Sequence, residues 1–277
     1  MELSYTRKTL AASVTFEGKG LHSGEPSRAT IHPYDQGLAF KFGGEVFAAL
    51  AENVTDTRRS TSIGPCRTIE HVLSALAGME FTDALIELEG CGELPALDGS
   101  SFEYVQGLDS VGSTELGTAE SHRLFTRAYV IKDNAKVAVG AGAGHWRFLL
   151  EGEGGRWPQH QEAEILSITD YQESVSKART WVFEDQIEMA RSAGLGLGLD
   201  ESSCLILGPH GPVNEARQDD EAAAHKLLDL MGDLALAGIP LRFLNVTAER
   251  SGHALHVQAA LKVRRELSLI PFEGEES

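Results

Sequence analysis

Ala224-His225-Lys226-Leu227-Leu228-Asp229-Leu230-Met231-Gly232-Asp233 combines a histidine and two aspartates with a mostly apolar run. It predicts a helix, and His225 and Asp229 lie four residues apart, so that both project from one face. The helix is apolar on most other sides, which predicts burial. A buried imidazole and carboxylate are costly unless something pairs with them. A divalent metal such as zinc would do so, with a third protein ligand and a water completing a catalytic site.

A candidate for the third ligand lies in a second predicted helix, 68–78, which ends at a glycine. His71 is in its first turn, and Glu70 precedes it directly. Since a metal-bound water needs a base to accept its proton, Glu70 is a candidate general base. Two simpler interpretations remain open: a buried histidine is often a hydrogen-bonded core residue, and an i, i+4 His/Asp pair is often a contact on a helix surface.

The composition is that of an ordinary globular protein. The chain has 277 residues, of which 42% are hydrophobic and 23% charged, and this length favours two domains. The net charge of −17 argues against nucleic-acid binding and against electrostatic docking on an anionic membrane. Three widely spaced cysteines fit a reducing compartment. With no signal peptide and no membrane-spanning apolar run evident, we expect a cytoplasmic protein without stable membrane insertion.

The residue pattern predicts short strands and helices in both halves of the chain. In the first half, strands are predicted at 13–16, 29–32, 38–42, 45–49 and 84–89, and helices at 68–78 and 101–108. In the second half, strands are predicted at 128–132, 136–139, 146–150, 205–207 and 241–248, and helices at 184–192, 219–237 and from the N-cap Ser251 to about 267. The polar segment 109–117 is predicted to be a linker, and the tail 273–277 to be frayed.

The two halves also show a weak internal similarity. Each contains a helix with an early histidine, regularly spaced leucines and a glycine at or after its end, namely His71 to Gly78 and His225 to Gly238. Chance similarity between two amphipathic helices is an equally good explanation. A true repeat would give two similar α+β layers that face each other, with the site between them.

Several short motifs together resemble the zinc-dependent UDP-3-O-acyl-N-acetylglucosamine deacetylases of lipid A biosynthesis. The motifs are GKGLHSG at 18–24, TIEH at 68–71, LDGS at 97–100, ART at 178–180, GLGLG at 194–198, HKLLD at 225–229, GD at 232–233 and SGHAL at 251–255. Each is a weak pattern alone. They occur in the order of the family and extend over nearly the whole chain.

This resemblance implies an α+β fold of two similar domains, 1–117 and 118–277, each with a small sheet packed on helices and with the active site at their junction. An insert in the second domain would form a hydrophobic passage for an acyl chain. The metal, Zn²⁺ with Fe²⁺ as a possible substitute, would be bound by His71, His225 and Asp229, and Glu70 would be the general base. The other implied roles are a charged partner opposite the base (His253), the residue that holds it (Asp233), a ligand of the carbonyl oxygen (Thr180) and substrate contacts (Lys226, Arg250 and His22).

His253 is subject to two opposing influences. It lies near a predicted helix N-terminus, whose positive end disfavours an imidazolium. Asp233, if it lies within hydrogen-bond distance, favours the charged form. Because an ion pair outweighs half a dipole charge at a similar distance, we expect His253 to be cationic near neutral pH.

Two segments depart from the family pattern. Ala222-Ala223-Ala224 replaces bulkier residues and an arginine, and segment 151–160 replaces a stretch that helps to hold the nucleotide in the family. The implied ligands and base are nevertheless present. We therefore expect a monomeric zinc amidohydrolase that removes acetate from an acylated UDP-amino sugar. The alternatives are the same chemistry on a different N-acylated amino sugar, and a non-catalytic binder of a nucleotide sugar or lipid.

Overall fold

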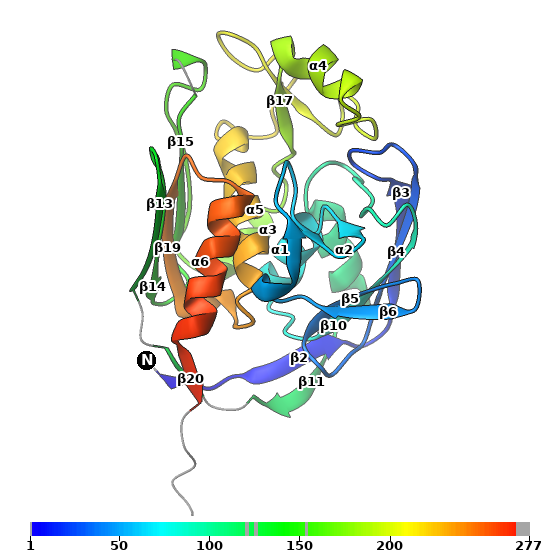
Figure 1. Ribbon diagram of the computed structural model, residues 1–277, viewed down its shortest axis with the longest axis vertical. Coiled ribbons are helices and arrows are strands. Elements are labelled where there is room, and N and C mark those ends of the chain that lie inside the picture. Colours follow the sequence, from blue (N-terminus) through cyan, green and yellow to red (C-terminus); the bar gives the residue numbers. More distant parts are fainter. Residues whose placement is uncertain (1, 120–121, 125–126, 153–154, 270–277) are drawn as a thin grey trace, which may run out of the picture.

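Two five-stranded sheets lie on opposite sides of the molecule, and the main helices lie between them (Figure 1). The computed structural model describes residues 2–119, 122–124, 127–152 and 155–269. The predicted tail 273–277 lies outside these described residues. None of the described helices is both long and apolar enough to cross a membrane.

The first sheet is built from the N-terminal half of the chain. Its strands, in spatial order, are β3 (Val14–Lys19), β4 (Pro26–His32), β10 (Ala84–Gly90), β5 (Leu38–Phe42) and β6 (Glu45–Ala48). β10 pairs antiparallel with β4 and parallel with β5. Alternate residues such as Ala29 and Ile31 are buried, as the two-residue period of a half-buried strand requires. The helices of this half are α1 (Glu70–Gly78) and α2 (Phe102–Val111).

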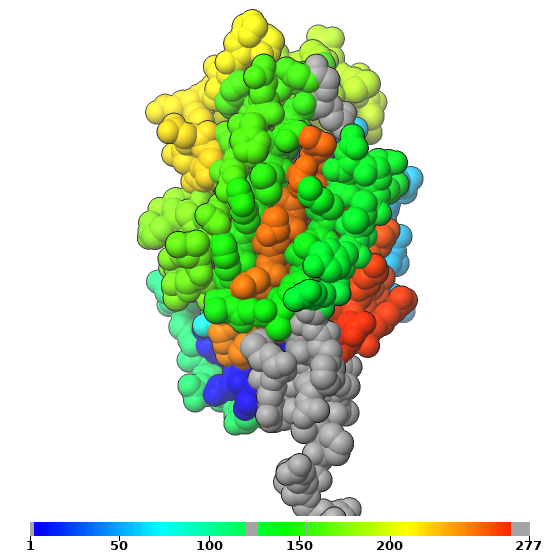
Figure 2. All heavy atoms as spheres, turned by 90° about the vertical axis from the view of Figure 1, so that its left-hand side faces the viewer, coloured from blue at the N-terminus to red at the C-terminus, as the bar shows by residue number. Residues whose placement is uncertain are grey.

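The second sheet repeats this arrangement. Its strands, in spatial order, are β13 (Arg127–Lys132), β14 (Ala135–Ala141), β19 (Leu244–Glu249), β15 (Trp146–Leu150) and β16 (Gln161–Ile165). β19 pairs antiparallel with β14 and parallel with β15. The helices are α5 (Glu221–Ala235) and α6 (His253–Glu266). Figure 2 shows the outer face of this sheet, with β19 in orange between green strands. Because element order and strand order agree in both halves, the internal similarity is a structural repeat.

The two halves meet where α1 packs against α5. Gly232 permits the closest part of this contact, because a Cβ atom there would lie 2.0 Å from the carbonyl oxygen of Glu70. Ala222, Ala223 and Ala224 are also fully buried. Small side chains along α5 therefore bring the helix carrying two candidate ligands close to the helix carrying the third.

Each half has an insert between its fourth sheet strand and its first long helix. The first insert contains β7 (Val54–Asp56), β8 (Ser62–Ile63) and β9 (Cys66–Arg67). The second contains α3 (Tyr171–Ser174), β17 (Trp181–Phe183), α4 (Ile187–Ser192) and β18 (Leu205–Leu207).

The remaining strands form smaller pairings outside the two large sheets. They are β2 (Thr6–Leu10) with β11 (Ser113–Thr118), and β12 (His122–Leu124) with β1 (Glu2–Leu3) and β20 (Leu267–Leu269). Short 3-10 helices lie at Ala51–Asn53, Ile168–Asp170, Glu184–Gln186 and Leu241–Phe243.

Three expectations from the sequence were wrong in detail. The segment 109–117 is not a linker, because its start completes α2 and Ser113–Thr118 forms a strand with β2. The strand predicted from residue 241 starts at Leu244, after a 3-10 turn. No bond from the Ser251 hydroxyl to the backbone of α6 is found among the described residues, and this hydroxyl instead bonds His256.

Candidate metal centre

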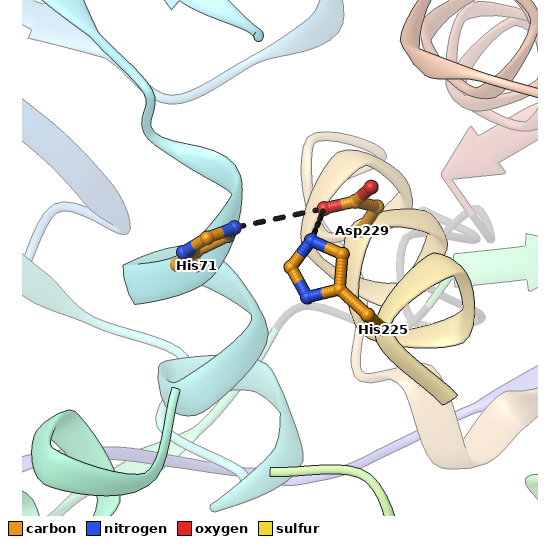
Figure 3. A group of neighbouring side chains, drawn as sticks. All are labelled: His71, His225 and Asp229. Atoms are coloured by element: carbon orange, nitrogen blue, oxygen red, sulfur yellow. Dashed lines mark ion pairs between the residues drawn. The ribbon is translucent and has the colours of Figure 1, made fainter. Parts of the chain in front are cut away.

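The three side chains that were expected to bind a metal meet at the junction of the two halves (Figure 3). Nε2 of His71, on α1, lies 3.7 Å from Oδ1 of Asp229, and Nε2 of His225 lies 3.5 Å from the same oxygen. The two imidazole rings are perpendicular, with centroids 5.1 Å apart. All three side chains are buried. Two nitrogens and one oxygen therefore converge on one point.

The protonation states of this group fit a divalent metal. Burial, together with the neighbouring His225, lowers the pKa of His71 to about 3. Burial also lowers the pKa of His225. Burial raises the pKa of Asp229, but Lys226 and the nearby imidazoles lower it by more, so the net shift is downward. Neutral imidazoles and an ionised carboxylate are the donor forms that such an ion requires.

The orientation of His225 is fixed by a backbone group. Its Nδ1 lies 3.1 Å from the carbonyl oxygen of Ala178, which can only accept a hydrogen bond. Nδ1 therefore carries the proton, and Nε2 keeps its lone pair directed toward Asp229. A backbone carbonyl that orients the imidazole in this way is a common second partner of metal-binding histidines.

Glu70 is a buried carboxylate beside this group. Its Oε2 accepts a 2.9 Å hydrogen bond from the backbone N–H of Thr61. Burial raises the pKa of Glu70 to about 8, an effect that His253 opposes and that Asp233 and Asp229 reinforce. A carboxyl group with a pKa in this range can take up and return a proton near neutral pH.

His253 is the first residue of α6, and one of its ring nitrogens lies within 4.8 Å of a carboxylate oxygen of Glu70. Its Nδ1 is 2.9 Å from Oδ2 of Asp233, so the expected contact between these residues is confirmed. Burial lowers the pKa of His253, but Asp233 and Glu70 raise it more strongly, to about 9. This direction agrees with the expectation of a cationic His253 near neutral pH, which stays a prediction.

Two neighbours of Asp233 were not singled out from the sequence. Thr61 Oγ1 donates to Oδ1 at 2.5 Å, and Nδ1 of His256 lies 2.9 Å from Oδ2. His256 follows His253 by three residues, so the helical spacing could have placed both imidazoles on one face. No comparable local pattern marks Thr61, because its contact joins residues 172 positions apart.

The centre opens into a cavity of about 1630 Å³. Except for Asp233, which lies behind His253, every residue expected at the site lines this cavity: His22, Glu70, His71, Thr180, His225, Lys226, Asp229, Arg250 and His253. Beyond the polar end, the walls include apolar side chains of the second insert, among them Trp181, Phe183, Ile187 and Ile206. One cavity thus joins a polar centre to an apolar extension.

Lys226 and Arg250 both have acidic partners at the cavity wall. Lys226 Nζ lies 2.7 Å from Oδ2 of Asp229, so this ammonium group contacts a candidate ligand. The Arg250 guanidinium forms an ion pair with Glu151, which belongs to the segment that departs from the family pattern. A phosphate that bound to Arg250 would therefore compete with this carboxylate.

His22 and Thr180 connect the first half of the chain with the second insert. Nδ1 of His22 accepts a 3.4 Å hydrogen bond from the N–H of Gly196. Glu93 holds the turn that carries His22 by accepting its backbone N–H at 2.7 Å. The backbone N–H of Thr180 donates to the carbonyl oxygen of Gly99 at 2.8 Å. The structure therefore places both residues at the junction, as expected.

Comparisons with known proteins point to one family. The family model described as "LpxC: UDP-3-O-acyl N-acetylglycosamine deacetylase" matches residues 7–265. The UDP-3-O-acyl-N-acetylglucosamine deacetylase of Anaeromyxobacter sp. (strain Fw109-5) is 34% identical over 94% of this chain and 88% of its own length. The enzyme of the same name from Trichormus variabilis is 33% identical over 92% of this chain and 97% of its own length. The enzyme of the same name from Aquifex aeolicus is 29% identical over 95% of this chain and 94% of its own length.

Proposed function

Because this chain belongs to the UDP-3-O-acyl N-acetylglycosamine deacetylase family, we propose that it hydrolyses the acetamide of UDP-3-O-acyl-N-acetylglucosamine. The reaction releases acetate and leaves a free amine for lipid A biosynthesis. The observation that carries this proposal is the convergence of His71, His225 and Asp229 beside Glu70 in the cavity. The match to the family over most of the chain supports the same conclusion.

The metal in this proposal is Zn²⁺, held by the two imidazoles and the carboxylate. Two histidines and one carboxylate are a common zinc-binding set that leaves a coordination position open, and Fe²⁺ is the alternative ion. When bound, the ion supplies Lewis acidity for the amide carbonyl and for the attacking water.

Glu70 takes the proton of the attacking water in this mechanism. The Thr61 N–H holds one carboxylate oxygen, which leaves the other to face the substrate. General base catalysis of this kind contributes roughly 10²–10⁴-fold to the rate. Glu70 then returns the proton to the departing amine, or His253 supplies one, because the amine has to leave in a protonated form.

His253 and Thr180 stabilise the negative charge that develops on the carbonyl oxygen. The imidazolium of His253 is held by Asp233 and lines the cavity. The hydroxyl of Thr180 is a second donor at the wall, and a well-placed donor to an oxyanion contributes roughly 2.7–4 kcal/mol.

Substrate recognition is divided between the two ends of the cavity. Lys226, Arg250 and His22 contact the polar part of the substrate, and the apolar side chains of the second insert take up the acyl chain. The diphosphate would replace Glu151 as the partner of Arg250. The expected division into two domains is supported by the repeat of sheet topology. Because β11 pairs with β2 as far as Thr118, the boundary between the domains belongs just after this strand.

Two properties outside the site belong to the same proposal. The protein acts in the cytoplasm, and its free cysteines, Cys66, Cys91 and Cys204, support a reducing compartment. A monomeric state stays a prediction, which gel filtration tests.

The test combines metal analysis with an acetate-release assay on the UDP substrate. Wild type should contain about one zinc per chain and release acetate. Glu70→Gln should retain zinc while kcat falls by roughly 10²–10⁴-fold. Glu45→Gln, an exposed carboxylate on β6, serves as the matched control and should be fully active. Unchanged turnover in Glu70→Gln would refute the assignment of the base. Acetate release from another N-acetylated amino sugar, but not from the UDP substrate, would favour the second amidohydrolase hypothesis.

A further inference from the structure

A row of hydrogen-bonded side chains extends from His253 through Asp233 and His256 to Ser251. Oγ of Ser251 is 2.8 Å from Nε2 of His256, and Nδ1 of His256 is 2.9 Å from Oδ2 of Asp233. The same oxygen is 2.9 Å from Nδ1 of His253. His256 and Asp233 are completely buried, and Ser251 is 6% exposed. Because Asp233 and His256 are shut off from solvent, their polar groups depend on protein partners.

The direction of each hydrogen bond follows from the groups involved. Burial raises the pKa of Asp233, but His253 and His256 lower it more, so the carboxylate is ionised and can only accept. Each imidazole therefore presents Nδ1–H to Oδ2. Burial lowers the pKa of His256, which is thus neutral and has a lone pair at Nε2. The Ser251 hydroxyl consequently donates to that nitrogen.

Only one of the two imidazoles is well placed to carry a positive charge. The attraction of a single carboxylate can offset the desolvation cost of one cation, whereas a second buried cation would lack a partner. The His253 side chain is 11% exposed and lines the cavity, whereas the His256 side chain is 0% exposed. The charge therefore belongs on His253, and His256 contributes a neutral donor.

We propose that His256 is a positioning residue, which as the neutral Nδ1–H tautomer holds the Asp233 carboxylate so that Oδ2 meets Nδ1 of His253. Thr61 holds the other oxygen of the same carboxylate from the first half of the chain. With both oxygens fixed, His253 has one orientation, in which Nε2–H is free for the substrate. The proposal rests on the proposed function only in that His253 acts on a substrate.

Two substitutions of His256 distinguish the effect of its hydrogen bond to Asp233 from the effect of its packing. In His256→Asn, the amide nitrogen can take the place of Nδ1 and donate to Asp233, but the shorter side chain does not reach Ser251. His256→Leu fills a similar volume without any donor. His145→Leu serves as the control, because His145 is an exposed histidine bonded to Glu164 outside the cavity.

The test joins kinetics with nitrogen-15 NMR of labelled histidines. His256→Leu should lower kcat by about 10- to 100-fold, as the loss of an orienting partner typically does, with KM and zinc content close to wild type. His256→Asn should restore most of kcat, and His145→Leu should behave as wild type. In wild type, the NMR spectrum should show His256 as the Nδ1–H tautomer at neutral pH.

Two results would overturn the proposal. One is an Nε2–H tautomer or an imidazolium at His256, which the wild-type spectrum reveals even if the leucine variant does not fold. The other is a folded His256→Leu protein with the kcat of wild type. A wild type that releases no acetate would instead refute the proposed function, and the tautomer would still decide the hydrogen-bond assignment.

Discussion

Deprotonation of His253 should remove about 3 kcal/mol from the stability of the folded protein, because its pKa is about 9 in the folded state against an ordinary value of 6.5. Each pKa unit corresponds to about 1.4 kcal/mol. A histidine whose pKa is raised by folding contributes stability that is fully present below its unfolded pKa. That contribution is lost as the pH rises through the folded pKa. The loss should therefore occur between pH 6.5 and about 9 to 10.

The measurement is urea unfolding of wild type and His253→Gln across this pH range. A chelator is included throughout, so that the pH dependence of metal binding does not contribute. The stability advantage of wild type over the variant should shrink by about 3 kcal/mol between pH 6.5 and 10. Asp233→Asn should remove most of the same pH-dependent part, since Asp233 is the largest influence that raises this pKa. A wild-type advantage that stays constant over the range would refute the reasoning.

Three further outcomes are expected. Gly232→Ala should destabilise the protein by about 1–3 kcal/mol and weaken metal binding, because the new Cβ would lie 2.0 Å from the Glu70 carbonyl oxygen. Gly140→Ala, with open space around it, is the control. Equal unfolding midpoints for the two variants would contradict the prediction. Arg179→Met should lower the free energy of unfolding by about 3–5 kcal/mol. The substitution leaves the carboxylate of Glu221, which is 1% exposed, without the guanidinium that lies 2.8 Å from it. An unchanged urea midpoint would contradict this prediction. Metal removal should lower the melting temperature, and a free metal concentration 1,000-fold above Kd should restore about 4 kcal/mol; calorimetry that finds no difference would argue against a folded-state site.

The local sequence pattern was sufficient to predict part of this fold and part of the candidate site. The positions of α1, α5 and most sheet strands follow from periodicity and turn residues, and the i, i+4 spacing places His225 and Asp229 on one face. His71 was a candidate third ligand because of its place in a second predicted helix. Only the family resemblance implied that it joins the other two, since no local rule connects residues so far apart in the chain. The repeat was visible only as a weak similarity between two helices, because strand order depends on contacts that the sequence pattern does not show.

The features that the sequence did not reveal depend on contacts with partners that lie far away in the chain or in the backbone. Ser113–Thr118 looked like a linker because its side chains are small and polar, yet a strand at a sheet edge needs only backbone N–H and C=O groups to pair. The pairing of Arg250 with Glu151 joins residues 99 positions apart. His256 was overlooked because a histidine on the buried face of a helix resembles an ordinary core residue until its partners are known.

The division of the candidate ligands between the two repeats has a consequence for the biosynthesis of the protein. One candidate ligand is residue 71, and the other two are residues 225 and 229. A nascent chain therefore presents a single imidazole from this group until synthesis has passed residue 229. If these three side chains bind the proposed ion, they can do so only after α5 has emerged from the ribosome, and a product terminated before α5 would lack two of the three ligands.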